Sequence, residues 1–257
     1  MSPMLVAYEQ DCKASRRAAP DLALCLNAAN TQLGHAPDPV FAKVNQKIIE
    51  LLDIDARQGE HAYHNRHHVG DVLMAVVLLC KQMDFDLTAP RARRVECMIT
   101  AALGHDLHHD GRGTGQGVDV ERGSATAVLT IARNAGLPAA DLALIESLIL
   151  ATYPPVQLTL RQKLAAPQAP DPEDVLTLVF GEADVLASLT PSFGLALSVA
   201  LSAEWRKAGL TFPSMPDEPA GREKFLGSYR LLTPSARRLG VDMMVIDQLQ
   251  HLKRNIS

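Results

Sequence analysis

Apolar residues in this chain recur at intervals of three and four residues, and this spacing constrains the fold more than any other feature. The segments from Val72 to Leu79 and from Leu142 to Leu150 are clear examples. Apolar positions with this spacing share one face of an α-helix. Aromatic residues, which favour strands, make up only 4% of the chain, and no segment alternates strictly between apolar and polar residues. The sequence therefore predicts an all-α protein, folded as a compact helical bundle.

The same periodicity places nine helices along the chain. Their expected ranges are Pro39 to Asp53, His68 to Met83, Pro90 to His105, Glu121 to Ala135, Ala139 to Thr152, Pro172 to Leu189, Gly194 to Ala208, Glu223 to Leu232 and Asp242 to Lys253. Glycine-rich or proline-rich breaks lie at 111–117, 165–172 and 211–221, and none is long or polar enough for an interdomain linker. We therefore expect residues 1–257 to form a single domain.

Charge and cysteine usage limit the partners and the compartment. The formal net charge is −4, and 25 basic residues are scattered among 29 acidic ones, so no basic stripe exists for duplex nucleic acid. No run of apolar residues is long enough for a membrane span. The four cysteines show no CxxC pair, and Cys80 and Cys97 lie in apolar segments. These features predict free thiols in a cytoplasmic protein that does not bind a membrane.

Histidines are concentrated in two short segments of the chain. Seven of the nine lie there: His61, His64, His67, His68, His105, His108 and His109. A single histidine on a helix is most simply a solvated side chain, but seven together call for a shared role.

Within these segments, a few residues have the spacing and chemistry of a metal site. His64, His68 and Asp71 share one side if their segment is helical. His105 and Asp106 end an apolar helix, where a buried carboxylate needs compensation. Neutral imidazole and ionised carboxylate are both ligands for Zn, Mn, Mg or Fe, so one or two divalent ions are expected.

A further ligand must come from elsewhere in the chain. Asp184 lies in an otherwise apolar helical segment, where it is either such a ligand or a solvent-facing side chain beside Glu182.

Two motifs give the chain a resemblance to a known family. Tyr63 to Val72 reads YHNxxHxxDV, and His105 to Gly111 reads HDxxHxG. On these motifs the chain resembles the HD-domain metal-dependent phosphohydrolases, and most closely the catalytic domain of class I 3′,5′-cyclic-nucleotide phosphodiesterases. The resemblance covers roughly 60–235, with fainter similarity in Ile149 to Thr152 and Glu204 to Gly209. A motif-bearing core over about 40–235 is therefore expected, with 1–40 as an N-terminal extension.

The resemblance implies a role for each matching residue. His68, His105, Asp106 and Asp184 would be metal ligands, His64 would give a proton to the leaving oxygen, and His109 would lie beside a second metal ion. The expected reaction is hydrolysis of a small phosphoester, such as a cyclic-nucleotide phosphodiester, by a metal-bound hydroxide. Glu121 would either hydrogen-bond a metal-bound water or simply favour a helix start.

The chain departs from the family where substrate specificity is set. Tyr153 and two prolines follow Thr152 where the family usually has Asp, and Arg222 stands three residues before Phe225 where the family has a purine-binding glutamine. Tyr63, Arg222 and Phe225 are the candidate substrate contacts, although Phe225 also fits a core position. Arginine cannot both donate and accept as an amide does, but it can bind phosphate or carboxylate.

Two other functions remain open. Related helical scaffolds carry a di-iron centre for oxygen chemistry, but they recruit further histidines, and none occurs between His109 and His251. A degenerate nucleotide-binding sensor would keep the fold without turnover.

A loop over 111–117 could also close over the site.

Overall fold

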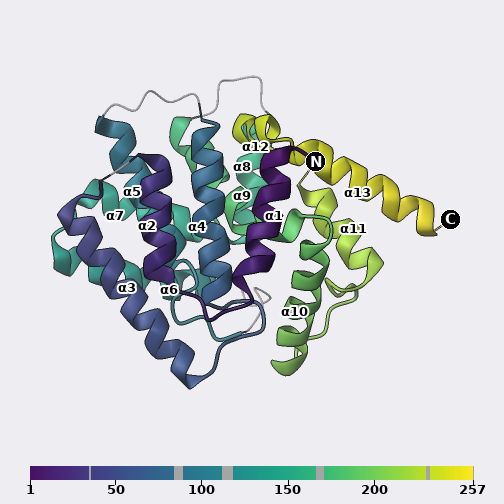
Figure 1. Cartoon of the computed structure of the whole chain (residues 1–257), viewed down its shortest axis with the longest axis horizontal. Coiled ribbons are helices and arrows are strands. Elements are labelled where there is room, and N and C mark those ends of the chain that lie inside the picture. The colour runs from purple at the N-terminus through teal and green to yellow at the C-terminus, as the bar shows by residue number, and fades with distance from the viewer. Residues whose placement is uncertain (35, 84–88, 112–117, 166–170, 230–231, 257) are drawn as a thin grey trace.

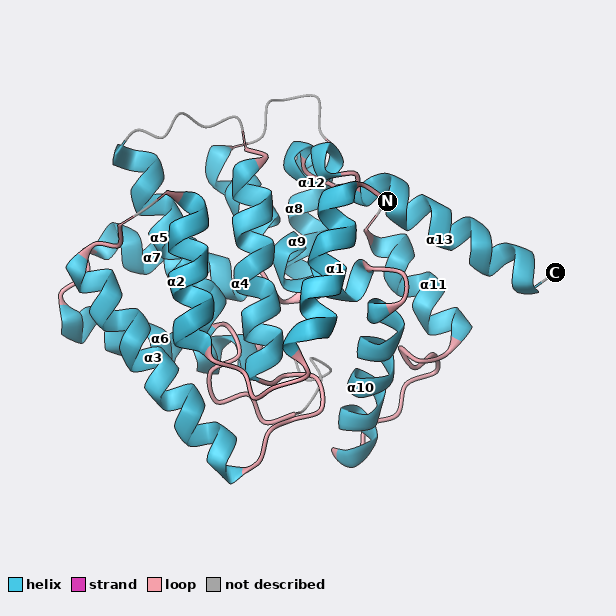
Figure 2. Cartoon of the chain, viewed as in Figure 1, coloured by secondary structure: helices cyan, strands magenta, loops and turns pink. Residues whose placement is uncertain are grey.

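The computed structural model describes residues 1–34, 36–83, 89–111, 118–165, 171–229 and 232–256. Over these ranges it is helical and contains no strand (Figure 2). The helices are α1 Pro3–Ser15, α2 Leu22–Leu33, α3 Pro39–Gln58, α4 Arg66–Lys81, α5 Ala89–Gly104, α6 Asp119–Ala135, α7 Ala139–Leu150, α8 Pro154–Leu164, α9 Pro172–Leu189, α10 Phe193–Lys207, α11 Pro219–Ser228, α12 Pro234–Leu239 and α13 Val241–Ile256. The predicted all-α class is confirmed.

Helix α4 occupies the centre of the bundle (Figure 1). It packs against α9, α2 and α5, and α1 also contacts it. Its sequence has apolar residues on most faces, as a helix surrounded by other helices requires. The helix that carries the first histidine motif is therefore held from several sides.

One large cluster of buried apolar side chains runs through the described part of the chain. It includes Leu5 near the start and Leu249 near the end, together with Cys80 and Cys97. All four cysteines are free, and three of them are buried, as the sequence predicted. Because Leu5 shares this cluster with the later helices, the N-terminal extension packs on the bundle.

A partly buried ion pair joins the extension to α4. The Arg16 guanidinium donates to both carboxylate oxygens of Asp71, at 2.6 and 2.5 Å, and the Tyr8 hydroxyl donates to the Asp71 carbonyl at 3.0 Å. Asp71 is only 4% exposed, so Arg16 and not water is the main partner of its carboxylate. The Asp of the first motif is thus paired with an arginine from outside the motif.

Each of the nine predicted helices has a counterpart in the structure, with ends shifted by up to five residues. Four further helices, α1, α2, α8 and α12, were not predicted. Three of these, α1, α8 and α12, begin at a proline, as do α3, α9 and α11. Proline suits the first helical turn because its ring fixes φ and no N–H is needed there. Pro154 therefore starts a helix just beyond the Ala151-Thr152 segment.

No single helix among the described residues combines the length and apolar character needed to cross a bilayer. Two sharply bent pairs, α7 with α8 and α9 with α10, reach that length and composition only when joined.

Candidate metal centre

The first histidine segment is held at the start of α4 by Asn65. Its side-chain oxygen caps the helix by accepting from the backbone N–H of His67 at 3.0 Å and of His68 at 3.2 Å. Its side-chain NH₂ donates to the carbonyls of His61 and Ala62. A capping asparagine satisfies N–H groups that have no partner within the helix. Asn65 therefore joins the preceding loop to the turn that carries His68.

The second segment follows the last residue of α5, which is Gly104. A Cβ atom at this position would overlap Cγ2 of Val128 on α6, so glycine permits the close approach of the two helices. His105 and Asp106 come directly afterwards, in a turn next to the α5–α6 contact. The placement of both residues thus depends on a position where only glycine fits.

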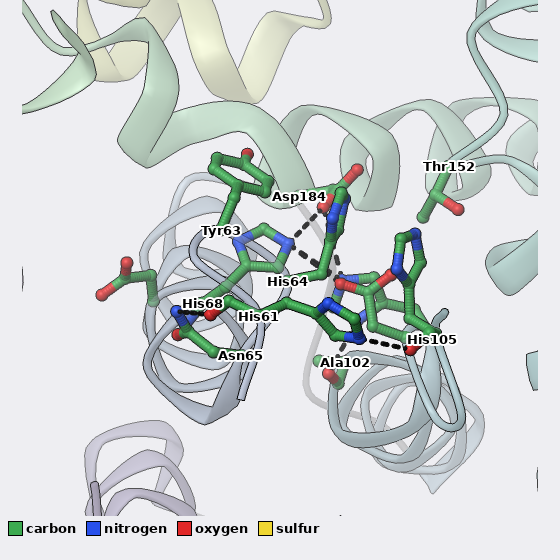
Figure 3. Close-up of polar contacts among 12 residues, drawn as sticks. His61, Tyr63, His64, Asn65, His68, Ala102, His105, Thr152 and Asp184 are labelled. Atoms are coloured by element: carbon green, nitrogen blue, oxygen red, sulfur yellow. Dashed lines mark hydrogen bonds and ion pairs between the residues drawn. The ribbon is translucent and has the colours of Figure 1, made fainter. Parts of the chain in front are cut away.

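Asp184 completes the group from the middle of α9, most of whose residues are buried. The side chains of His68 and Asp184 face one another across the α4–α9 contact (Figure 3). Asp184 therefore points into the site, and the alternative of a solvent-facing side chain is wrong.

Four ligand atoms from these residues converge on one point. His68 Nε2 lies 3.1 Å from Asp184 Oδ1, 3.4 Å from Asp106 Oδ2 and 3.2 Å from His105 Nε2. His105 Nε2 lies 3.2 Å from Asp106 Oδ2 and 3.4 Å from Asp184 Oδ1. The ligand atoms of His68, His105 and Asp184 all lie within 4.8 Å of one another, and Asp106 Oδ2 lies within 3.4 Å of both imidazoles, so nitrogen and oxygen donors suited to a divalent ion are gathered here. The group thus has the dimensions of a cation site.

The protonation states within this group also fit a cation. His105 Nδ1 donates to the Ala102 carbonyl at 3.0 Å, so Nε2 is the nitrogen that faces the carboxylates; it donates to them when protonated, and it would offer its lone pair to a cation when the ring is neutral. Asp106 Oδ2 is buried without any hydrogen-bond partner. An unpartnered buried carboxylate oxygen is costly, and a divalent ion would remove that cost. Burial raises the pKa of Asp184, but hydrogen bonds from His105 and His68 outweigh burial and lower it to about 2.

A second group of side chains adjoins the first. His64, Asp106 and His109 each offer an atom within 4.8 Å of the others, and Asp106 belongs to both groups. The rings of His64 and His109 are stacked, with centroids 3.8 Å apart and planes 21° apart. A cavity of about 310 Å³ opens over these three residues. Asp106 is therefore the point where the cation site meets the space available to a ligand.

Glu204 on α10 holds His64 in place, a role that was not predicted from the sequence. Its Oε1 accepts from His64 Nδ1 at 2.5 Å, and its Oε2 accepts from the backbone N–H groups of Tyr63 and His64 at 2.8 and 3.1 Å. Burial raises the pKa of Glu204, but the hydrogen bond and charge of His64 lower it to about 2. The carboxylate thus keeps a proton on His64 Nδ1 and leaves Nε2 for the cavity.

The two stacked histidines differ in their readiness to carry a charge. Burial lowers the pKa of His64, but Asp106 and Glu204 outweigh burial and raise it. For His109, burial and the neighbouring His64 charge lower the pKa to about 4. Of the two rings, His64 is therefore the one that is more readily protonated.

Glu121 lies in the first turn of α6 and is buried. Its Oε2 has no hydrogen-bond partner, and burial, followed by the charges of Asp106 and Asp184, raises its pKa. Glu121 thus lies near the carboxylates of the site, and its hydrogen bond to a metal-bound water stays a prediction.

None of the three candidate substrate contacts lines the cavity. Tyr63 is only 8% exposed; its ring packs on His64 and His68, and its hydroxyl is 2.9 Å from Ser188 Oγ. It therefore supports the histidine rings from behind.

Arg222 is 2% exposed and donates to the Ser188 and Thr190 carbonyls at 2.6 and 3.2 Å. These carbonyls lie at the end of α9, where a helix has unsatisfied acceptors and a negative dipole end. Arg222 is thus engaged with backbone and is not available to bind a phosphate or carboxylate.

Phe225 fits the core alternative that the sequence left open. Its ring is partly buried against the main apolar cluster and lies 5.2 Å from that of Tyr229. The expected closing loop at 111–117 lies outside the described residues apart from Gly111.

No protein-family model matches this chain, and no curated protein matches it.

Proposed function

We propose that this chain is a metal-dependent phosphohydrolase of the HD-domain type, which cleaves a small phosphoester such as a nucleotide phosphodiester. The proposal rests on one observation above all. Two imidazoles and two carboxylates from α4, α9 and the turn after α5 gather with nitrogen–oxygen distances of 3.1 to 3.4 Å, and one buried oxygen, Asp106 Oδ2, makes no hydrogen bond.

His68, His105, Asp106 and Asp184 are the residues that would hold the cation. When bound, a divalent ion lowers the pKa of a water and neutralises negative charge on phosphoryl oxygens. The remaining steps belong to side chains of the protein. His64, with Nδ1 bonded to Glu204, presents Nε2 to the cavity and can give a proton to the leaving oxygen. General acid catalysis of this kind contributes about a hundredfold to ten-thousandfold.

The cavity limits the size of the substrate. At about 310 Å³ it is at the lower end of the range for small-molecule sites, which suits a mononucleotide or a smaller ester. Arg222 and Tyr63 do not line the cavity, so two of the expected substrate contacts are missing from it. Substrate selection therefore depends on the polar rim of the cavity, which includes Asp55, Asn65 and His108.

The free cysteines support a reducing compartment, and we place the protein in the cytoplasm on that basis.

The test is a screen of metal-analysed protein against cyclic nucleotides, nucleoside monophosphates and an aryl phosphodiester. We expect His64→Ala to keep the metal and lose most turnover, and Asp106→Ala to lose both. Equal loss of metal in the two variants would contradict the division of roles. Two bound irons with a visible absorption band would support the oxygenase alternative. Nucleotide binding without hydrolysis by any metal form would support the sensor.

A further inference from the structure

His61 contacts the turn that carries His109, and His61 has no role in the reaction proposed above. Its Nε2 is 2.9 Å from the His109 carbonyl oxygen. A carbonyl only accepts, so the His61 proton is on Nε2 and that nitrogen donates. His61 thereby connects the loop before α4 to the turn after α5 (Figure 3).

Gly111 completes the contact between these two segments. It has φ +75°, and a Cβ there would lie 2.6 Å from His61 Nδ1. Both the backbone conformation and the His61 ring therefore exclude a side chain at this position. Gly111 N–H donates to His109 Nδ1 at 3.0 Å. Two hydrogen bonds therefore hold His109 in this turn: its carbonyl accepts from His61 Nε2, and its ring Nδ1 accepts from the Gly111 N–H.

The second hydrogen bond decides the tautomer of His109. Because Nδ1 accepts from an N–H group, the proton of the neutral ring must be on Nε2. A nitrogen that carries a proton cannot ligate a cation, but it can donate to an anionic oxygen. His64 is different, since its Nδ1 donates to Glu204 and its Nε2 carries the lone pair when the ring is neutral.

We propose that His61 is a positioning residue that, with Gly111, locks His109 as an Nε2–H donor for a phosphoryl oxygen. This rests on the proposed function only for the identity of the oxygen. The tautomer itself is a property of the protein alone. With this tautomer, His109 presents an N–H donor to the group of His64, Asp106 and His109. A second cation in that group would need a lone pair from His109 instead.

The experiment follows the ring nitrogens of His109 by long-range ¹H–¹⁵N correlation spectra. The variants are His61→Ala, His61→Gln, whose amide can still donate to the carbonyl, and His251→Ala as a control on the distant helix α13. In the wild-type protein we expect a pure Nε2–H tautomer for His109, and a shift of that N–H when inorganic phosphate is added. His61→Ala should give mixed tautomers and lose the phosphate response, and His61→Gln should restore both.

Turnover of an aryl phosphodiester provides the second readout. His61→Ala should lower kcat about 10- to 100-fold with unchanged metal content, the effect typical of a lost supporting contact. His61→Gln should recover most of this loss, and thermal unfolding shows whether each variant is folded. An Nδ1–H tautomer in the wild-type protein, or an unchanged tautomer in His61→Ala, would overturn the proposal. If the wild-type protein hydrolyses no phosphoester, the proposed function fails, while the ring spectra still decide the role of His61.

Discussion

Replacement of Glu204 by glutamine tests how the protein keeps a proton on His64. The wild-type carboxylate accepts three hydrogen bonds, two from backbone N–H groups and one from His64 Nδ1. The amide oxygen of glutamine can keep the two backbone bonds. Its NH₂ group, however, faces Nδ1 and can only donate, so the doubly protonated imidazolium loses its acceptor. Glu204→Gln therefore removes one bond between charged groups and leaves the fold of the loop in place.

The size of the effect follows from that single bond. A hydrogen bond involving a charged group contributes about 1.5–3 kcal/mol to the state that has it. Since ~1.36 kcal/mol corresponds to a factor of ten in rate, kcat should fall roughly 10- to 150-fold. The bond is buried at a carboxylate that is only 3% exposed, so solvent does not screen it.

The assay compares two phosphodiesters that differ only in the leaving group. An alkoxide needs a proton as it departs, but a 4-nitrophenolate does not, so only the alkyl ester should show the full loss. Metal content should be unchanged, and Glu146→Gln, an exposed change of the same kind on α7, should behave as wild type. An equal loss for both esters, or a loss of metal, would refute the role given to Glu204.

Three further predictions concern stability. A divalent ion that binds the candidate metal centre, added at a hundred times its Kd, should stabilise the fold by ~2.7 kcal/mol. In a thermal melt this should raise Tm by about 5–11 °C, and Asp184→Asn should abolish the shift. Gly104→Ala should cost about 1–3 kcal/mol in denaturant unfolding because the new methyl overlaps Val128, and Val128→Ala in the same chain should recover most of it. Burial raises the pKa of Glu9, but hydrogen bonds from Phe193 and Ser192 lower it overall, so the carboxylate stabilises the fold above its unfolded pKa. The difference in unfolding free energy between wild type and Glu9→Gln should therefore be largest at neutral pH and disappear as pH falls through the folded pKa of Glu9. A difference that stays constant with pH would contradict this role of the Glu9 carboxylate.

The ligands of the candidate site could be predicted because their signal is local. His68, His105 and Asp106 lie within short motifs, and Asp184 is a carboxylate in an otherwise apolar helix. Helical periodicity likewise located most of the long helices. The structure adds the distances at which these side chains meet.

Other parts of the site depend on contacts that sequence spacing does not encode. Glu204 is 140 residues from His64, and beside Arg206 and Lys207 it has the appearance of a charge on a solvated helix face. Arg222 was expected at the substrate because of its spacing from Phe225. Its actual partners are carbonyls at the end of α9, which only the packing of α11 on the bundle brings within reach.

The salt bridge between Arg16 and Asp71 changes what can be regarded as the smallest working unit of this protein. A fragment trimmed to about 40–235 would contain every expected metal ligand and the whole of both motifs. It would also leave Asp71 on the central helix without Arg16, and it would remove the Tyr8 contact and the apolar side chains of α1 that belong to the main core. Grafting or shortening efforts should therefore carry the first helix along, or replace Asp71 with a neutral side chain of similar shape.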